Sequence, residues 1–118
     1  MSEEDQVDTT AAEGADREGV AARQTALVIV MQVHENDAWA SPVADRILSR
    51  SPLDQQDRNF AANLAFSTLR WEGTLDWVLA NAVSRGLEAV EPTLLDLLRI
   101  ATWELLHGNQ PVHAVVDS

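Results

Sequence analysis

The stretch from Pro92 to Gly108, PTLLDLLRIATWELLHG, decides the fold. Leucine, isoleucine and alanine occupy most of its positions, so a helix over these residues is apolar on nearly every side and needs neighbours around it. Proline suits the first helical turn, where its missing N–H costs nothing. His107 and Gly108 are typical of a helix end, since a cation suits the negative end of the helix dipole and glycine is a frequent cap. We therefore expect a central core helix here.

The segments before this core helix show further helical patterns bounded by loop-forming residues. The run VAARQTALVIVMQVHEN, over 20–36, contains no glycine or proline and is longer than a usual strand. It predicts a helix over about 20–35 that is buried on most sides. Ser41 and Pro42 form a helix-start signal, a hydroxyl cap before the position that tolerates a missing N–H, and predict a short helix over 42–50.

Two more helices are expected between residues 54 and 86. Asp54 predicts the N-cap of a helix that reaches Trp71, with Asp57 at its third position. Apolar residues at three- and four-residue spacing from Leu75 onward predict the next helix, closed by Gly86. Because strand patterns and internal repeats are missing from the sequence, the fold class is predicted to be an all-α bundle of five to six helices.

Some aromatic and polar residues can be assigned to helix faces. Phe60, Leu64 and Trp71 share one stripe of the third helix, which predicts an inward face, whereas Asn63 and Arg70 lie on other faces. Large apolar rings are usually buried. We therefore assign Trp77 and Trp103 to the core.

Residues 1–19 differ in composition from the rest. They contain seven acidic residues against a single base, Arg17, which predicts a disordered acidic tail before a helical domain over 20–118. This start has neither the basic nor the apolar part of a signal peptide. The longest apolar run, six residues from Ala26 to Met31, falls short of the ~20 that a membrane span needs. We expect a cytoplasmic protein with no membrane partner.

The charge balance restricts the classes of partner. Nineteen acidic residues face eight basic ones, all arginine, for a formal net charge of −11. Phosphate binding needs clustered cations, and a field of this sign repels RNA at long range. RNA binding is therefore expected to be weak or assisted, while a basic protein is a favourable partner.

The sequence offers no pattern typical of catalysis or of a bound metal. It contains no cysteine, which excludes a thiol nucleophile and a cysteine-based zinc site. Three histidines lack the i, i+4 spacing of a helical zinc site: His34, His107 and His113. Asp54 and Asp57 are interpreted as helix-start residues, and Asp96 with Glu104 as a solvated helix flank. We expect no enzyme activity, cofactor or metal.

Several motifs together resemble the NusB-like N-terminal domain of RsmB-type rRNA cytosine-5 methyltransferases, over nearly all of 22–118. The matching motifs are Arg23 in the first helix, Asp57-Arg58 through Leu69-Arg70 in the third, Leu75-Asp76, Pro92 to Leu106, and Pro111 to Val116. They are specific in combination. The family commonly has Tyr-Gly where this chain has Phe66-Ser67, and Trp103-Glu104-Leu105 is closer to the free-standing antitermination factor NusB, which shares the fold.

The resemblance implies an RNA-associated accessory domain without the catalytic domain, which in the family binds S-adenosylmethionine and carries two functional cysteines. In that family the first helix helps to contact RNA. The resemblance therefore implies Arg23 as an RNA-binding residue, with Arg17 upstream and Arg70 on the third helix as further candidates. Two other interpretations stay open: Arg23 and Arg70 as surface salt-bridge residues, and Trp71 as a base-stacking rather than a packed ring.

Two alternatives to this function also stay open. A NusB-type antitermination or protein-interaction module would bind a basic ribosomal protein, and a truncated reading frame would have no independent function. The family's domain continues through at least one more helix after the segment that ends here at Ser118. We therefore expect the C-terminal part of the bundle to be missing and leucines of the core helix to stay exposed in a groove, through which two chains form a homodimer.

Overall fold

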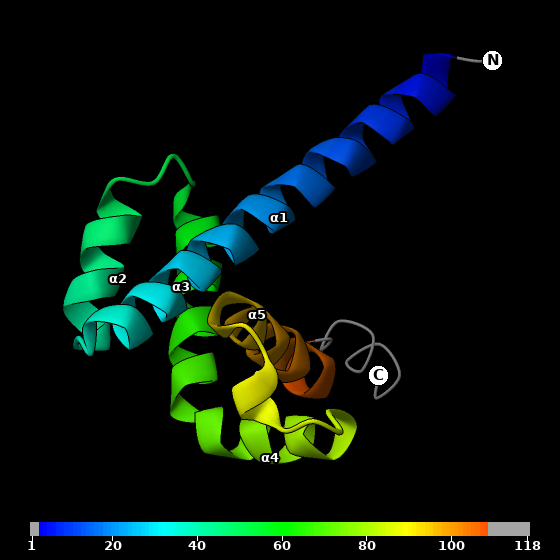
Figure 1. The fold of residues 1–118 in the computed structure, drawn as a ribbon. Helices are drawn as coiled ribbons and strands as arrows, with labels where there is room; N and C mark the ends of the chain where they lie inside the picture. Colours follow the sequence, from blue (N-terminus) through cyan, green and yellow to red (C-terminus); the bar gives the residue numbers. More distant parts are fainter. Residues whose placement is uncertain (1–2, 109–118) are drawn as a thin grey trace.

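The computed structural model describes the backbone of residues 3–108 and the side chains of residues 19–107. Five α-helices follow one another along the chain (Figure 1): α1 (Glu3–Asn36), α2 (Ala40–Ser49), α3 (Gln55–Arg70), α4 (Glu72–Ala82) and α5 (Pro92–Trp103). A 3-10 turn, η1 (Leu87–Ala89), precedes α5, and a π-helical turn, η2 (Glu104–Gly108), continues it. No strand occurs within residues 3–108, so the all-α prediction is confirmed. The further helix expected after Pro111 lies outside the described residues.

Helix α1 begins at Glu3, well before the start near residue 20 that the sequence predicts. Its N-terminal half extends away from the other helices (Figure 1). A helix without tertiary contacts depends on local backbone hydrogen bonds, which are marginal in water. The disordered tail over residues 1–19 stays a prediction from the sequence.

The core lies where the second half of α1 crosses α3. Alanines at this crossing, Ala22 and Ala26 of α1 and Ala61 and Ala65 of α3, are fully buried. Small side chains let two helix axes approach closely. Larger apolar residues from four helices fill the space around the crossing: Ile29 and Val30 of α1, Val43 of α2, Leu64 of α3 and Ile100 of α5. In Figure 1, α2 lies on one side of the α1–α3 pair and α4 with α5 on the other.

Helix α3 begins as predicted, but its buried face differs from the predicted stripe. The Asp54 carboxylate accepts a hydrogen bond from the backbone N–H of Asp57 at 2.8 Å, which confirms the N-cap. The buried residues of α3 are the following: Ala61, Leu64, Ala65 and Thr68. Phe60 and Trp71 are exposed, because the small residues at 61 and 65 turn their side of the helix toward α1. Of the predicted stripe, Leu64 alone is buried.

Two helix ends also differ from prediction. Helix α2 begins at Ala40 after Trp39, which makes no side-chain cap, so Ser41 lies inside the first turn rather than at the N-cap. Helix α4 ends at Ala82, and Gly86, the predicted C-cap, instead precedes η1 with a φ of 90°. Glycine adopts positive φ without the steric cost that a Cβ imposes, which explains its place in this turn.

Helix α5 begins at Pro92 as predicted, and the Glu91 carboxylate caps it by accepting hydrogen bonds from the N–H groups of Thr93 and Leu94. Of its apolar residues, Ile100 is buried in the core, whereas Leu94 and Leu97 are nearly half exposed. The described part of the chain therefore leaves one face of α5 uncovered, as expected from its apolar surface.

Candidate functional site: a cleft between α2 and α3

A cleft of about 650 Å³ lies between the start of α2 and the second half of α3. The residues that line it are Ala40, Ser41, Asn63, Phe66, Ser67, Leu69 and Arg70. Four of them follow the spacing i, i+3, i+4, i+7 along α3, which places them on one face of a helix. This face is distinct from the buried face of α3, so the helix presents one side to the core and another to the cleft.

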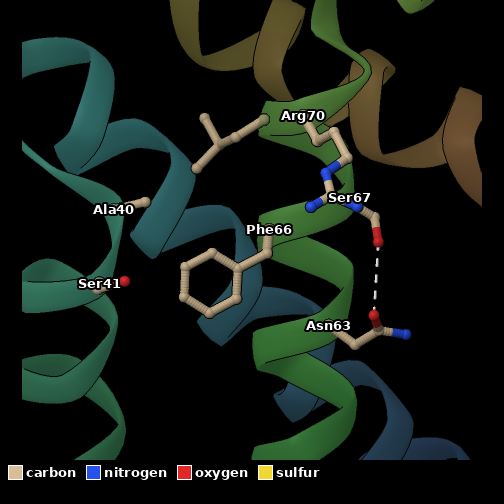
Figure 2. A pocket seen from close by; sticks show the side chains of 7 residues that line it. Ala40, Ser41, Asn63, Phe66, Ser67 and Arg70 are labelled. Carbon is tan, nitrogen blue, oxygen red and sulfur yellow. Dashed lines mark hydrogen bonds between the residues drawn. The ribbon is translucent and has the colours of Figure 1, made fainter.

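Figure 2 shows how the cleft residues lie. The Phe66 ring reaches from α3 toward Ala40 and Ser41 on α2, and Arg70 lies one turn further along the same helix. The Ser67 hydroxyl donates a hydrogen bond to the Asn63 side-chain oxygen at 3.4 Å, and in Figure 2 the Asn63 amide nitrogen points away from the Phe66 ring. The cleft therefore combines an aromatic ring, hydrogen-bond donors and a cation.

The charge of the cleft is opposite to that of the chain. None of the seven lining residues is acidic, and the side chain of Arg70 makes no ion pair or hydrogen bond within the described residues. The chain as a whole carries a formal net charge of −11. An anion that approaches Arg70 therefore does not have to displace a bound carboxylate there.

Arg23, the other described candidate, lies in a different environment. Its guanidinium donates hydrogen bonds to both carboxylate oxygens of Glu104, at 2.9 and 3.0 Å, and lies 5.3 Å from the centre of the Phe60 ring. The hydrogen bonds to Glu104 raise the pKa of Arg23 above its ordinary value. Its side chain remains 48% exposed, so the pair is a surface one that contributes little to stability.

The structure does not bring the three candidate arginines together. Arg23 and Arg70 line separate hollows of the surface. Arg17 lies outside the part of the chain whose side chains are described. The salt-bridge interpretation therefore fits Arg23, whereas Arg70 has no such partner among residues 19–107.

Arg23 lines a second, apolar groove of about 280 Å³ between α1 and α5. The other residues of this groove are Val20, Gln24, Leu27, Leu97, Ile100, Ala101 and Glu104. Half of the Val20 side chain and nearly half of Leu97 are exposed here. The groove is the place where the uncovered face of α5 meets α1.

A polar cluster that the sequence analysis missed joins α1, α4 and α5. His34 contacts Asp96 through Nδ1 at 2.8 Å and Glu72 through Nε2 at 2.5 Å. A carboxylate oxygen only accepts, so both contacts are hydrogen bonds at once only when both ring nitrogens carry a hydrogen. Asp96 is buried, which contradicts its interpretation as part of a solvated flank.

Arg99 provides the charge that makes this burial tolerable. It donates two parallel hydrogen bonds to the Asp76 carboxylate, at 2.7 and 2.9 Å, and a third to Asp96 at 3.0 Å. The hydrogen bonds to Asp76 raise the pKa of Arg99. The i, i+3 spacing of Asp96 and Arg99 on a leucine-rich helix is the sequence signal that could have indicated the pair.

The assignments of two tryptophans to the core have different outcomes. Trp77 is 72% exposed on α4, so that assignment is wrong: the inward positions of this helix are taken by Leu75 and Leu79. Trp103 packs against the core and stacks on His107 with ring centres 4.0 Å apart. The exposed ring of Trp71 follows Arg70 but does not line the cleft.

Among the residues that the structure describes, no group of three or more histidine or acidic side chains is placed to hold a metal ion. None of the helices within residues 3–108 is both long and apolar enough to span a bilayer.

The helical bundle defines an all-α domain, and comparison with known proteins identifies its family. The sequence profile of the NusB family matches residues 20–118. The chain therefore belongs to the NusB family, as the motifs from Arg23 to Val116 predict. No solved structure gives a significant match to the chain.

Three relatives give the context of this domain. A protein of Mycobacterium tuberculosis named as a methyltransferase is 36% identical over 97 residues, which is 82% of this chain and 21% of that protein. Ribosomal RNA small subunit methyltransferase B of Thermus thermophilus is 34% identical over 95 residues, or 80% of this chain and 23% of the relative. The protein of that name in Serratia proteamaculans is 27% identical over 94 residues, which is 80% of this chain and 21% of that relative.

The chain spans about a fifth of the length of the relatives that it matches. It corresponds to their NusB-like N-terminal part.

Proposed function

We propose that this chain is a non-catalytic accessory domain that holds RNA in rRNA (cytosine-5) methylation. Membership of the NusB family and the names of the relatives support the process. The observation that carries the RNA contact is the cleft between α2 and α3. In this acidic chain the seven lining residues include no carboxylate, and Arg70 has no ion-pair partner among residues 19–107. Arg70, Arg23 and Arg17 are the proposed RNA contacts.

The test is fluorescence anisotropy of the 118-residue chain with labelled fragments of small-subunit rRNA. We expect weak binding, with a Kd of about 1–100 µM, because few phosphates are neutralised. The logarithm of the affinity should fall with that of the salt concentration, with a slope of roughly −0.7 for each phosphate contacted on a single strand. Sub-nanomolar binding that ignores salt, or no binding at low salt, would contradict the proposal.

A charge-matched pair of variants tests the role of α1. Arg23→Glu should weaken RNA binding more than Arg46→Glu, although each changes the net charge equally. Arg46 donates a hydrogen bond to Gln32 and lines neither the α2–α3 cleft nor the α1–α5 groove. Equal effects of the two variants would remove Arg23 from the proposed contacts.

The non-catalytic part of the proposal has its own assay. The chain contains no cysteine, and a thiol is the nucleophile that the family's chemistry implies. Incubation of the purified chain with labelled S-adenosylmethionine and rRNA should transfer no methyl group. Incorporation of label above that of a boiled sample would contradict this expectation.

The net charge of −11 favours a second candidate function, binding of a basic ribosomal protein. A pull-down of purified small ribosomal proteins by the chain distinguishes ribosomal-protein binding from the proposed RNA binding. Retention of one such protein, together with no RNA binding at low salt, would replace the proposed RNA contact by this function.

A further inference from the structure

The Phe66 ring is an exposed aromatic surface inside a cleft. It is 38% exposed, and it lies on the face of α3 that is turned away from the buried residues Ala61 and Leu64. Figure 2 shows the ring between α3 and the start of α2. Burial of such a ring is favourable, so its accessibility leaves a free energy gain for any planar group that stacks on it.

Groups that bind a phosphate lie one helical turn from this ring. Arg70 follows Phe66 by four residues, a rise of about 6 Å along the helix axis. The i, i+4 spacing makes Phe66 and Arg70 neighbours on one face of α3, so a single nucleotide can contact both. The hydroxyl of Ser41 adds a donor from the α2 side of the same cleft.

We propose that the α2–α3 cleft binds one unpaired nucleotide of RNA, with its base on Phe66 and its phosphate at Arg70. This inference rests on the proposed RNA-binding function and specifies the form of RNA. Aromatic stacking tolerates any base, because every base has a π-face. In an A-form duplex the bases are stacked on one another and their faces are covered, so the cleft selects single-stranded RNA.

The size and charge of the cleft agree with this ligand. Its volume of about 650 Å³ lies within the range of about 300–1,000 Å³ that is typical of small-molecule sites. A basic protein segment would bring cations toward Arg70, in a cleft whose lining offers no carboxylate to receive them. The local charge therefore favours a nucleotide over a basic peptide.

The experiment uses the full 118-residue chain and a fluorescein-labelled ten-nucleotide RNA of mixed sequence, alone or annealed to its complement. Phe66→Leu removes the stacking surface while keeping an apolar side chain. This variant should weaken binding of the single strand about fivefold, which is the low end of the cost of losing one stacked base. It should change binding of the duplex less than twofold. Arg70→Gln should weaken single-strand binding and reduce the salt slope by about 0.7.

Two controls match these variants. Trp77→Leu removes an exposed aromatic ring from α4, and Arg85→Gln removes an exposed arginine outside the cleft. Neither should change binding more than twofold. Thermal melts of all four variants verify that the helical bundle is intact.

The outcomes separate this inference from the proposed function. If the wild-type chain binds the single strand but Phe66→Leu and Arg70→Gln behave like their controls, the nucleotide site is wrong and RNA binding stands. If the wild-type chain binds neither the single-stranded nor the annealed RNA at low salt, the nucleotide site and the proposed RNA-binding function are both refuted. Loss of ribosomal-protein binding in Phe66→Leu, with RNA binding unchanged, would show that the cleft is a protein site and would overturn the inference.

Discussion

Replacement of Arg99 by methionine tests whether the polar cluster stabilises the bundle. Arg99 is 12% exposed in its side chain and is the cation that compensates Asp96, which is 5% exposed. Removal of one partner of a buried ion pair typically costs 3–5 kcal/mol, since the other charge stays buried. Asp76 is 30% exposed and can turn to water, so we expect a smaller loss of about 2–3 kcal/mol.

Such a loss is large against a total stability of about 5–15 kcal/mol. It corresponds to a fall in Tm of roughly 10–20 °C for a domain of this size. Urea unfolding followed by circular dichroism measures the free energy, and Arg85→Met is a control with the same change in charge. A double-mutant cycle with Asp76→Asn should give a coupling energy of at least ~1 kcal/mol. A loss within about 0.5 kcal/mol of the control would refute the structural role of the cluster.

Three further predictions concern a helix cap, the groove and the tail. Hydrogen bonds from the N–H groups of Leu94 and Thr93 lower the pKa of Glu91, so its contribution is present above the ordinary pKa of a glutamate and is lost as the pH falls through the lowered value. The stability difference between wild type and Glu91→Gln, measured by urea unfolding, should therefore shrink on acidification, and a constant difference from pH 7 to 3 would be contrary evidence. We propose that the α1–α5 groove mediates a homodimer; Leu97→Glu should then shift sedimentation toward the monomer, and an unchanged profile would exclude this groove. Deletion of residues 1–19 should leave the Tm within about 2 °C, because the backbone of the first half of α1 extends away from the other helices (Figure 1); a larger fall would show that this segment stabilises the fold.

The caps and helix order could be predicted because they depend on neighbours in sequence. The Asp54 carboxylate binds an N–H only three residues away, and Pro92 begins α5 where its missing N–H is harmless. Such signals do not depend on where the other helices lie. For the same reason, the position of Arg70 on an outward face of α3 was predictable from its spacing.

The polar cluster and the aromatic positions could not be predicted in this way. Asp96 and His34 are separated by 62 residues, and the burial of Asp96 depends on how α1 crosses α5. The same holds for Phe60, which the alanines on the neighbouring face of α3 displace from the core. Hydrophobicity indicated that this helix is amphipathic, but the side of closest approach was decided by small residues.

The ion pair between Arg23 and Glu104 connects two surfaces of the domain. Both residues line the apolar groove between α1 and α5, so an RNA phosphate that draws Arg23 away from Glu104 removes the polar bridge beside the groove. Binding at the two places is then thermodynamically linked. Whatever fills the groove changes the affinity of Arg23 for a phosphate by a certain factor, and the phosphate changes the affinity of the groove by that same factor.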